Sequence, residues 1–299
     1  MLFSRAVSRA GAAMMRAPAL RTLCDSPKSI SDADLAFNLR SGSDNIDLDA
    51  ASKEAVYDPH LTTIMANNKK WVENQVQNDP EFFRRLNDPQ APKYLWVGCS
   101  DARIPADSLT GTRPGQMFVH RNLANLVVNT DLNFMSVLQY AVNVLEVPHI
   151  IVCGHYDCGG VRAACTNEDR GLMEHWFKNI RDVYRLHFDE LNRIRDPEAR
   201  HRRLVELNVI EQCLNLYKTG IVQRKRMATK NSHHYQFSMP RVHGVVFDPV
   251  DGVLHNLHIH NHYKETIHKY GSIYTMRYNG STAEPSPFDP MNMSLTDPV

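Results

Sequence analysis

Apolar residues along the chain gather in short continuous runs and in longer stretches of mixed polarity. Continuous runs begin at Tyr94, Met117 and His149, where the sequence reads YLWVG, MFVH and HIIVCG. Such runs are typical of strands buried on both faces of a sheet. The mixed stretches predict helices, and Thr130 is the expected cap of one that Pro148 prevents from continuing. The predicted helices cover residues 61–86, 131–146, 172–191 and 199–218.

Two further strands are predicted within residues 241–259, joined by a turn at Asp248–Gly252. Because the earlier strands alternate with helices, they form a parallel sheet, and the late pair adds an antiparallel strand at its edge. The expected fold is therefore α/β, with a mostly parallel central sheet, an antiparallel edge strand and flanking helices. Residues 61–86 form a helical arm ahead of the core.

The two ends of the chain differ from this core in composition. Residues 1–25 carry four arginines and no acid before Cys24, interspersed with apolar residues, which is typical of a mitochondrial presequence. The prediction is a matrix protein after presequence removal; the alternative is an ordinary N-terminus. The expected organisation is a presequence, a polar linker, the folded domain with its arm, and a disordered tail, at residues 1–25, 26–60, 61–278 and 279–299.

Composition narrows the class of partner. The net charge of +1 gives no electrostatic reason to expect nucleic acid or an anionic membrane. No apolar run approaches the roughly 20 residues that span a bilayer. The six cysteines are too sparse for a disulfide-stapled secreted scaffold, so they indicate metal binding or core packing.

Two of these cysteines and one histidine follow predicted strand ends. Cys99 follows the first strand, His155 follows the third, and Cys158 comes three residues later. Ligands of open α/β sheets gather beyond the carboxyl ends of strands, so the three can meet there. Two thiolates and one imidazole suit zinc and leave a fourth position open. By spacing alone the signal is weak to moderate, and a buried strand-end cysteine with a helix-capping histidine explains the pattern slightly better than zinc.

An acid and a base follow the first cysteine. Asp101 and Arg103 lie two residues apart, directly after Cys99. A carboxylate beside a metal can bind it or accept a proton, and a guanidinium can hold that carboxylate in place. The alternative is a surface ion pair of about 0–1 kcal/mol.

The segments CSDAR, RPGQMFVHRNLANLV and LQYAVNVLEVPHIIVCGHYDCGG resemble the signature of the β-class carbonic anhydrases. The resemblance runs from Lys93 to Leu172 and, more loosely, to Ile259. It implies reversible hydration of carbon dioxide to bicarbonate by zinc-bound hydroxide. One zinc ion per chain would be held by Cys99, His155 and Cys158, with an Asp101–Arg103 catalytic dyad. It also implies a homodimer, often paired into a tetramer, whose helical arms wrap the partner.

The resemblance assigns further residues to substrate binding. One of them donates a hydrogen bond to substrate across the dimer interface, and the others line or face a small apolar pocket. They are Gln90, Phe118, Leu123, Tyr140 and Gly159. Trp96 resembles a residue of the bacterial subgroup regulated by bicarbonate, but Phe247 stands where that subgroup has a tyrosine. The regulatory site is therefore not expected to be complete, and Trp96 fits a core position as well.

Other interpretations stay open at this point. His258, His260 and His262 would share one face of an extended strand, as a second metal site, a proton relay or solvated edge residues. A relative on the same scaffold that hydrolyses carbon disulfide or carbonyl sulfide keeps the three ligands. A zinc-stabilised structural protein would lack the acid–base pair, whereas Asp101 and Arg103 are both present.

Overall fold

A computed structural model describes residues 59–230 and 237–276 of the 299-residue chain. The predicted presequence, most of the linker and the tail lie outside these residues, so those predictions remain untested. The chain divides into two units at Asn74–Gln75. Helix α3 (Pro59–Asn78) covers all that is described of the first unit and is treated by itself.

The second unit contains a five-stranded sheet in the order β2-β1-β3-β4-β5. Strands β1 to β4 run parallel, and β5 pairs with β4 in the antiparallel direction. The predicted mostly parallel sheet with one antiparallel edge strand is therefore confirmed. The strands are β1 (Tyr94–Cys99), β2 (Met117–Asn122), β3 (His149–His155), β4 (Arg241–Phe247) and β5 (Leu254–Asn256).

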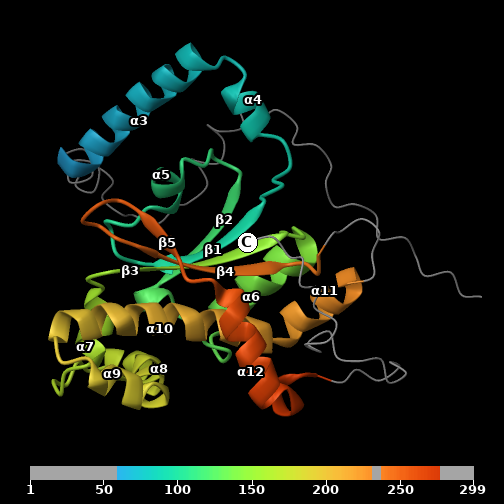
Figure 1. The fold of residues 1–299 in the computed structure, drawn as a ribbon. Coiled ribbons are helices and arrows are strands. Elements are labelled where there is room, and N and C mark those ends of the chain that lie inside the picture. Colours follow the sequence, from blue (N-terminus) through green and yellow to red (C-terminus); the bar gives the residue numbers. More distant parts are fainter. Residues whose placement is uncertain (1–58, 231–236, 277–299) are drawn as a thin grey trace, which may run out of the picture. The chain divides into compact units, whose positions relative to one another are not determined.

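Most helices lie on one side of this sheet, and the short α5 lies on the other (Figure 1). Those between β1 and β3 are α5 (Ala106–Thr110), the 3-10 turn η1 (Leu123–Asn125), α6 (Leu132–Gln139) and the π-turn η2 (Tyr140–Val144). The remainder are α4 (Phe82–Leu86), α7 (Gly159–Ala164), α8 (Met173–Leu186), α9 (Phe188–Arg193), α10 (Pro197–Lys218), α11 (Gly220–Lys230) and α12 (Ile259–Tyr274).

The larger apolar core fills the space between the sheet and α10. Gly154 of β3 permits close packing there, because a Cβ atom at this position would lie 2.5 Å from Val209 Cγ2. A smaller cluster on the opposite face contains Trp96, Ile104 of the β1–α5 loop, and Phe247. Trp96 is 1% exposed, so it is a core residue, and the cluster lacks the tyrosine hydroxyl in question.

Two helical predictions and one strand interpretation need correction. The helix after Thr130 is capped by Asp131, whose carboxylate accepts a hydrogen bond from the Asn133 amide. The stretch 61–86 is two helices, because Pro80 separates α3 from α4. The region around His258 is not an extended strand: α12 begins at Ile259, so His260 and His262 lie in its first turn and do not share a face.

Among the described residues, no helix combines the length and the apolar character needed to cross a bilayer.

Candidate metal centre

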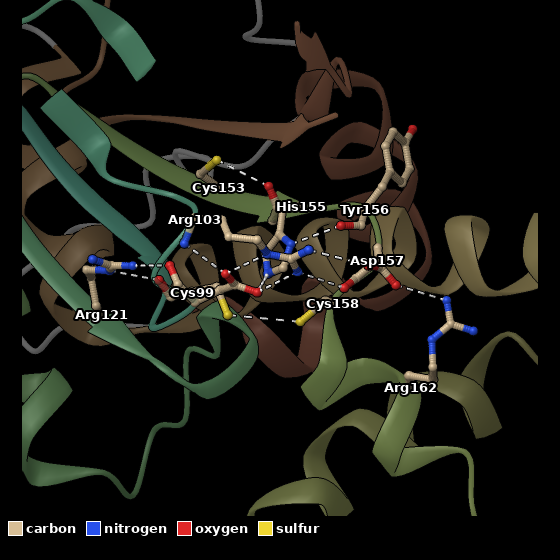
Figure 2. A network of polar contacts seen from close by, with 11 residues as sticks. Cys99, Arg103, Arg121, Cys153, His155, Tyr156, Asp157, Cys158 and Arg162 are labelled. Atoms are coloured by element: carbon tan, nitrogen blue, oxygen red, sulfur yellow. Dashed lines mark hydrogen bonds and ion pairs between the residues drawn. The ribbon is translucent and has the colours of Figure 1, made fainter. Parts of the chain in front are cut away.

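Cys99, His155 and Cys158 meet beyond the carboxyl ends of two neighbouring strands (Figure 2). Cys99 ends β1, His155 ends β3, and Cys158 precedes the first residue of α7. The chain passes from β1 to β2 on one side and to β3 on the other, which makes this the point where strand order reverses. One sulfur or nitrogen atom from each residue lies within 4.8 Å of the others.

The donor atoms fit a tetrahedral metal ion. The two sulfur atoms are 4.0 Å apart, and two sulfurs on one zinc ion lie roughly 3.8 Å apart. His155 is completely buried, and its Nδ1 lies 2.9 Å from the carbonyl oxygen of Tyr156. That contact leaves the buried Nε2, which has no hydrogen-bond partner among the described residues. A buried nitrogen between two thiols is the arrangement expected of a metal ligand.

The proton affinities of the two thiols move in opposite directions. Interaction with Cys158 lowers the pKa of Cys99, and interaction with His155 lowers it further. The contact with the Cys99 sulfur raises the pKa of Cys158, and the burial of Cys158 raises it further. The two sulfurs therefore share one proton in the absence of a metal ion, and an ion bound here would take both as thiolates.

Asp101 lies between the metal ligands and an arginine. Its carboxylate accepts hydrogen bonds of 2.8 and 3.0 Å from Arg103, and its Oδ2 is 3.8 Å from His155 Nε2. The hydrogen bond from Arg103 lowers the pKa of Asp101 to about 2. The carboxylate is thus ionised and aimed at the side of the site where the three donor atoms meet.

Comparison with known proteins decides the family. A family model described as "Carbonic anhydrase" matches residues 94–254. A protein of Emericella nidulans named "Carbonic anhydrase" is 50% identical over 196 residues, which make up 66% of this chain and 82% of that protein. The chain belongs to the β-class carbonic anhydrases. It is therefore a carbonic anhydrase, an enzyme that hydrates carbon dioxide.

Two further relatives bear on assembly and location. A solved structure from Sordaria macrospora, one of two tetrameric β-carbonic anhydrases described together, has a TM-score of 0.62 and 35% identity; the match covers 67% of this chain and 98% of that one. An Arabidopsis thaliana protein named "Beta carbonic anhydrase 6, mitochondrial" is 37% identical over 107 residues, 33% of this chain and 37% of that protein.

The residues assigned to the substrate pocket of this carbonic anhydrase are only partly brought together. The rings of Phe118 and Tyr140 lie 5.7 Å apart. The carbonyl of Leu123 accepts a 2.8 Å hydrogen bond from Trp176 of α8, which fixes the η1 turn. Gly159 opens α7 directly after Cys158, with no atom within 4 Å of where a Cβ would stand. Gln90 is exposed and makes no hydrogen bond with the described part of the chain.

Sequence reasoning did not identify the residues that hold the ligand loops in place. Arg121 donates a 2.8 Å hydrogen bond to the carbonyl oxygen of Cys99 and a second to that of Asp101. Asp157 lies between two metal ligands with φ of 56° and faces both Arg103 (3.5 Å) and Arg162 (3.2 Å). The position of Asp157 between two predicted ligands, His155 and Cys158, is the sequence feature that indicates such a role.

The η1 turn beside the metal centre is fastened from α10. Buried Asn208 donates a 3.0 Å hydrogen bond to the Ala124 carbonyl, and buried Gln212 accepts a 2.8 Å bond from the Val127 amide. Ala124 and Asn125 both have positive φ angles, which cost free energy in residues with a side chain. The two amide side chains therefore help to keep a strained turn next to Cys99.

Proposed function

We propose that this β carbonic anhydrase hydrates carbon dioxide at one zinc ion per chain held by Cys99, His155 and Cys158. The observation that carries the proposal is the set of three donor atoms within 4.8 Å, one of them a buried Nε2 without a partner in the described residues. When bound, zinc supplies a Lewis acid that makes a water molecule acidic enough to act as nucleophile. Two thiolates and a neutral imidazole balance the charge of the ion.

The chain's own residues orient the ligands and handle the proton. The Tyr156 carbonyl selects the imidazole tautomer that leaves Nε2 free for metal. Asp101 Oδ2, 3.8 Å from that nitrogen, would accept a hydrogen bond from a metal-bound water and so orient that water for loss of its proton. Arg103 holds the carboxylate in that position through two hydrogen bonds, which is why the pair acts as a dyad.

Carbon dioxide would bind in an apolar pocket formed by Phe118, Tyr140 and Leu123, with Gly159 leaving room beside the metal. The contact between the Phe118 and Tyr140 rings supports this assignment. Gln90 would act on the active site of a partner subunit, since its exposed side chain makes no hydrogen bond with the described residues of its own chain.

We infer a homodimer that pairs into a tetramer. The tetrameric Sordaria macrospora structure supports this assembly. Strand β2 is an edge of the sheet, with backbone groups that no other described strand pairs, and Val119 on it is 47% exposed, so this edge can pair with a second copy of the chain. Removal of residues before Asn87 would then yield monomeric or poorly folded protein, and a stable, active dimer without them would refute the role of the arm.

We also propose that the protein acts in the mitochondrial matrix. The arginine-rich, acid-free N-terminus supports this location, and so does the name of the Arabidopsis thaliana relative. Imaging of the full-length chain beside a chain that begins after residue 25 tests it. Mitochondrial import of both forms would refute the presequence.

Stopped-flow hydration of carbon dioxide at mildly basic pH tests the mechanism, with zinc-loaded protein that lacks residues 1–25. We expect fast hydration, a loss of about 10²-fold or more in Asp101→Asn and a loss of roughly 10- to 100-fold in Arg103→Gln. Cys158→Ser removes a ligand and abolishes the activity. Unchanged rates in Asp101→Asn would refute the dyad, whereas absent hydration at one zinc per chain would redirect the assay to carbon disulfide and carbonyl sulfide.

A further inference from the structure

A pocket of about 610 Å³ opens among α7, α8, α9 and α10, and the carbonic anhydrase mechanism makes no use of it. One part of its wall is apolar and aromatic, formed by Ile180, Tyr184, Phe188 and Leu204. This volume is far larger than carbon dioxide or bicarbonate needs. Its size is instead that of a small organic molecule.

The charged side chains that line the pocket are all positive. Four arginines line the pocket, and no described aspartate or glutamate does; the arginines are Arg162, Arg181, Arg185 and Arg200. Three of them pair with carboxylates that stand outside the lining. Arg200 makes no ion pair or side-chain hydrogen bond within the described part of the chain, so its guanidinium is available to an anion.

The thiol of Cys165, which also lines the pocket, responds to this positive charge. Burial raises the pKa of Cys165, and the charges of Arg200, Arg181 and Arg162 each act in the opposite direction. Burial outweighs these charges at the sulfur itself, but all three guanidinium groups lie close enough to this lining atom to attract negative charge toward it. An anion in the same space would experience the same attraction.

A buried polar group in the lining also lacks a partner. His201 is 8% exposed, and its Nε2 makes no hydrogen bond with any described residue. It follows Arg200 in the first turns of α10, at the same pocket. Because a buried imidazole nitrogen without a partner is costly, a polar group bound beside Arg200 is a suitable partner for it.

We propose that this pocket binds a small organic carboxylate with an apolar body. The carboxylate pairs with the Arg200 guanidinium and satisfies His201, while the body packs on Tyr184 and Phe188. The aromatic wall favours such a ligand over inorganic phosphate, which would leave that wall in contact with water. The site is separate from the metal centre, so its test does not depend on the proposed mechanism.

Calorimetric titration of the zinc-loaded protein with octanoate tests the proposal. We expect one octanoate to bind per chain outside the metal centre. Acetate, which lacks the apolar body, and octanamide, which lacks the charge, should each bind at least tenfold more weakly. Arg200→Gln should weaken octanoate binding at least tenfold, and His201→Leu should weaken it as well. Arg195→Gln, which removes an exposed arginine that does not line the pocket, should leave it unchanged.

Because carboxylates can also bind metal ions, the location is checked separately. Crystals grown with 8-bromooctanoate should show anomalous bromine signal beside Phe188. Signal confined to the metal centre, equal binding by wild type and folded Arg200→Gln, no binding at millimolar octanoate, or phosphate binding as tight as octanoate would each overturn the proposal.

Discussion

Strand β3 begins and ends with a histidine, and the two have different surroundings. At the amino end, His149 lies half-buried with its Nδ1 3.1 Å from His243 Nε2, and its ring stacks on Tyr94. At the carboxyl end, His155 is completely buried, and its Nε2 points among thiols without a hydrogen-bond partner in the described residues. The two residues lie about 20 Å apart along the strand.

The difference shows what turns a strand-end histidine into a ligand. His149 is hydrogen-bonded to a second imidazole, that of His243. No described cysteine or acid joins His149 in a cluster of possible metal ligands. His155 has one nitrogen fixed by a backbone carbonyl and the other left over beside Cys99 and Cys158. The loops that follow parallel strands converge only at the carboxyl end, which is where the extra donors come from.

The largest expected effect comes from exchanging each histidine for glutamine. His155→Gln should lose bound zinc and lower carbon dioxide hydration by about 10³-fold or more, because the metal supplies several kcal/mol of barrier reduction. His149→Gln is the matched control on the same strand and should keep one zinc per chain and its rate. Elemental analysis and stopped flow measure both. Loss of zinc from His149→Gln would show that the two ends are not independent.

Metal removal should give the next largest effect. A ligand that binds the folded state at a thousand times its dissociation constant stabilises it by about 4 kcal/mol, so stripping zinc with dipicolinate should lower the melting temperature by roughly 10 °C. Added zinc should restore the temperature in wild type and in His149→Gln. Recovery in His155→Gln would contradict the assignment of His155 as a ligand.

The contrast between the two ends of β3 also shows which features of the fold and the site can be predicted from the sequence. The continuous apolar runs at Tyr94 and His149 predict the central strands, because a strand covered on both faces must be apolar throughout. Cys99 and His155 follow from their places at strand ends. The two residues meet only because β1 and β3 are neighbours in the sheet. The local hydrophobic pattern does not predict this strand order, whereas the family resemblance implies it.

Other contacts had no local signal. Asn208 and Gln212 lie on a helix predicted from its apolar face, but their partners at Ala124 and Val127 lie more than eighty residues away in the sequence. The helix α12 was missed because the dense histidines around His258 read as an alternating strand. His258 precedes the helix in a left-handed conformation. The sequence around it contains no residue pattern that predicts this conformation.

The amino end of the strand should in turn show a pH effect on stability. Burial, together with the neighbouring His149 and Arg241, lowers the pKa of His243 to about 4. The unfolded chain takes up this proton near pH 6.5, so stability is complete above that pH and falls as the pH drops toward 4.

His243→Gln should therefore remove about 2 kcal/mol of that acid-side loss in urea unfolding of zinc-loaded protein. His175→Gln, which removes an exposed imidazole on α8, is the control and should leave the acid-side loss unchanged. An identical pH dependence in wild type and His243→Gln would show that another group causes the loss.

The smallest effect tests whether the two ends of β3 act independently. Tyr94 stacks on His149 with ring centroids 5.7 Å apart, and such a pair contributes about 1 kcal/mol beyond its buried area. Tyr94→Leu should lower the free energy of unfolding by roughly that amount while zinc affinity stays the same. In the double variant with Cys158→Ser, the two losses of stability should add to within about 0.5 kcal/mol, as they do for distant sites. A larger coupling would mean that packing at the amino end of β3 adjusts the position of His155, and the strand would then be a mechanical link between its two histidines rather than a rigid support for both.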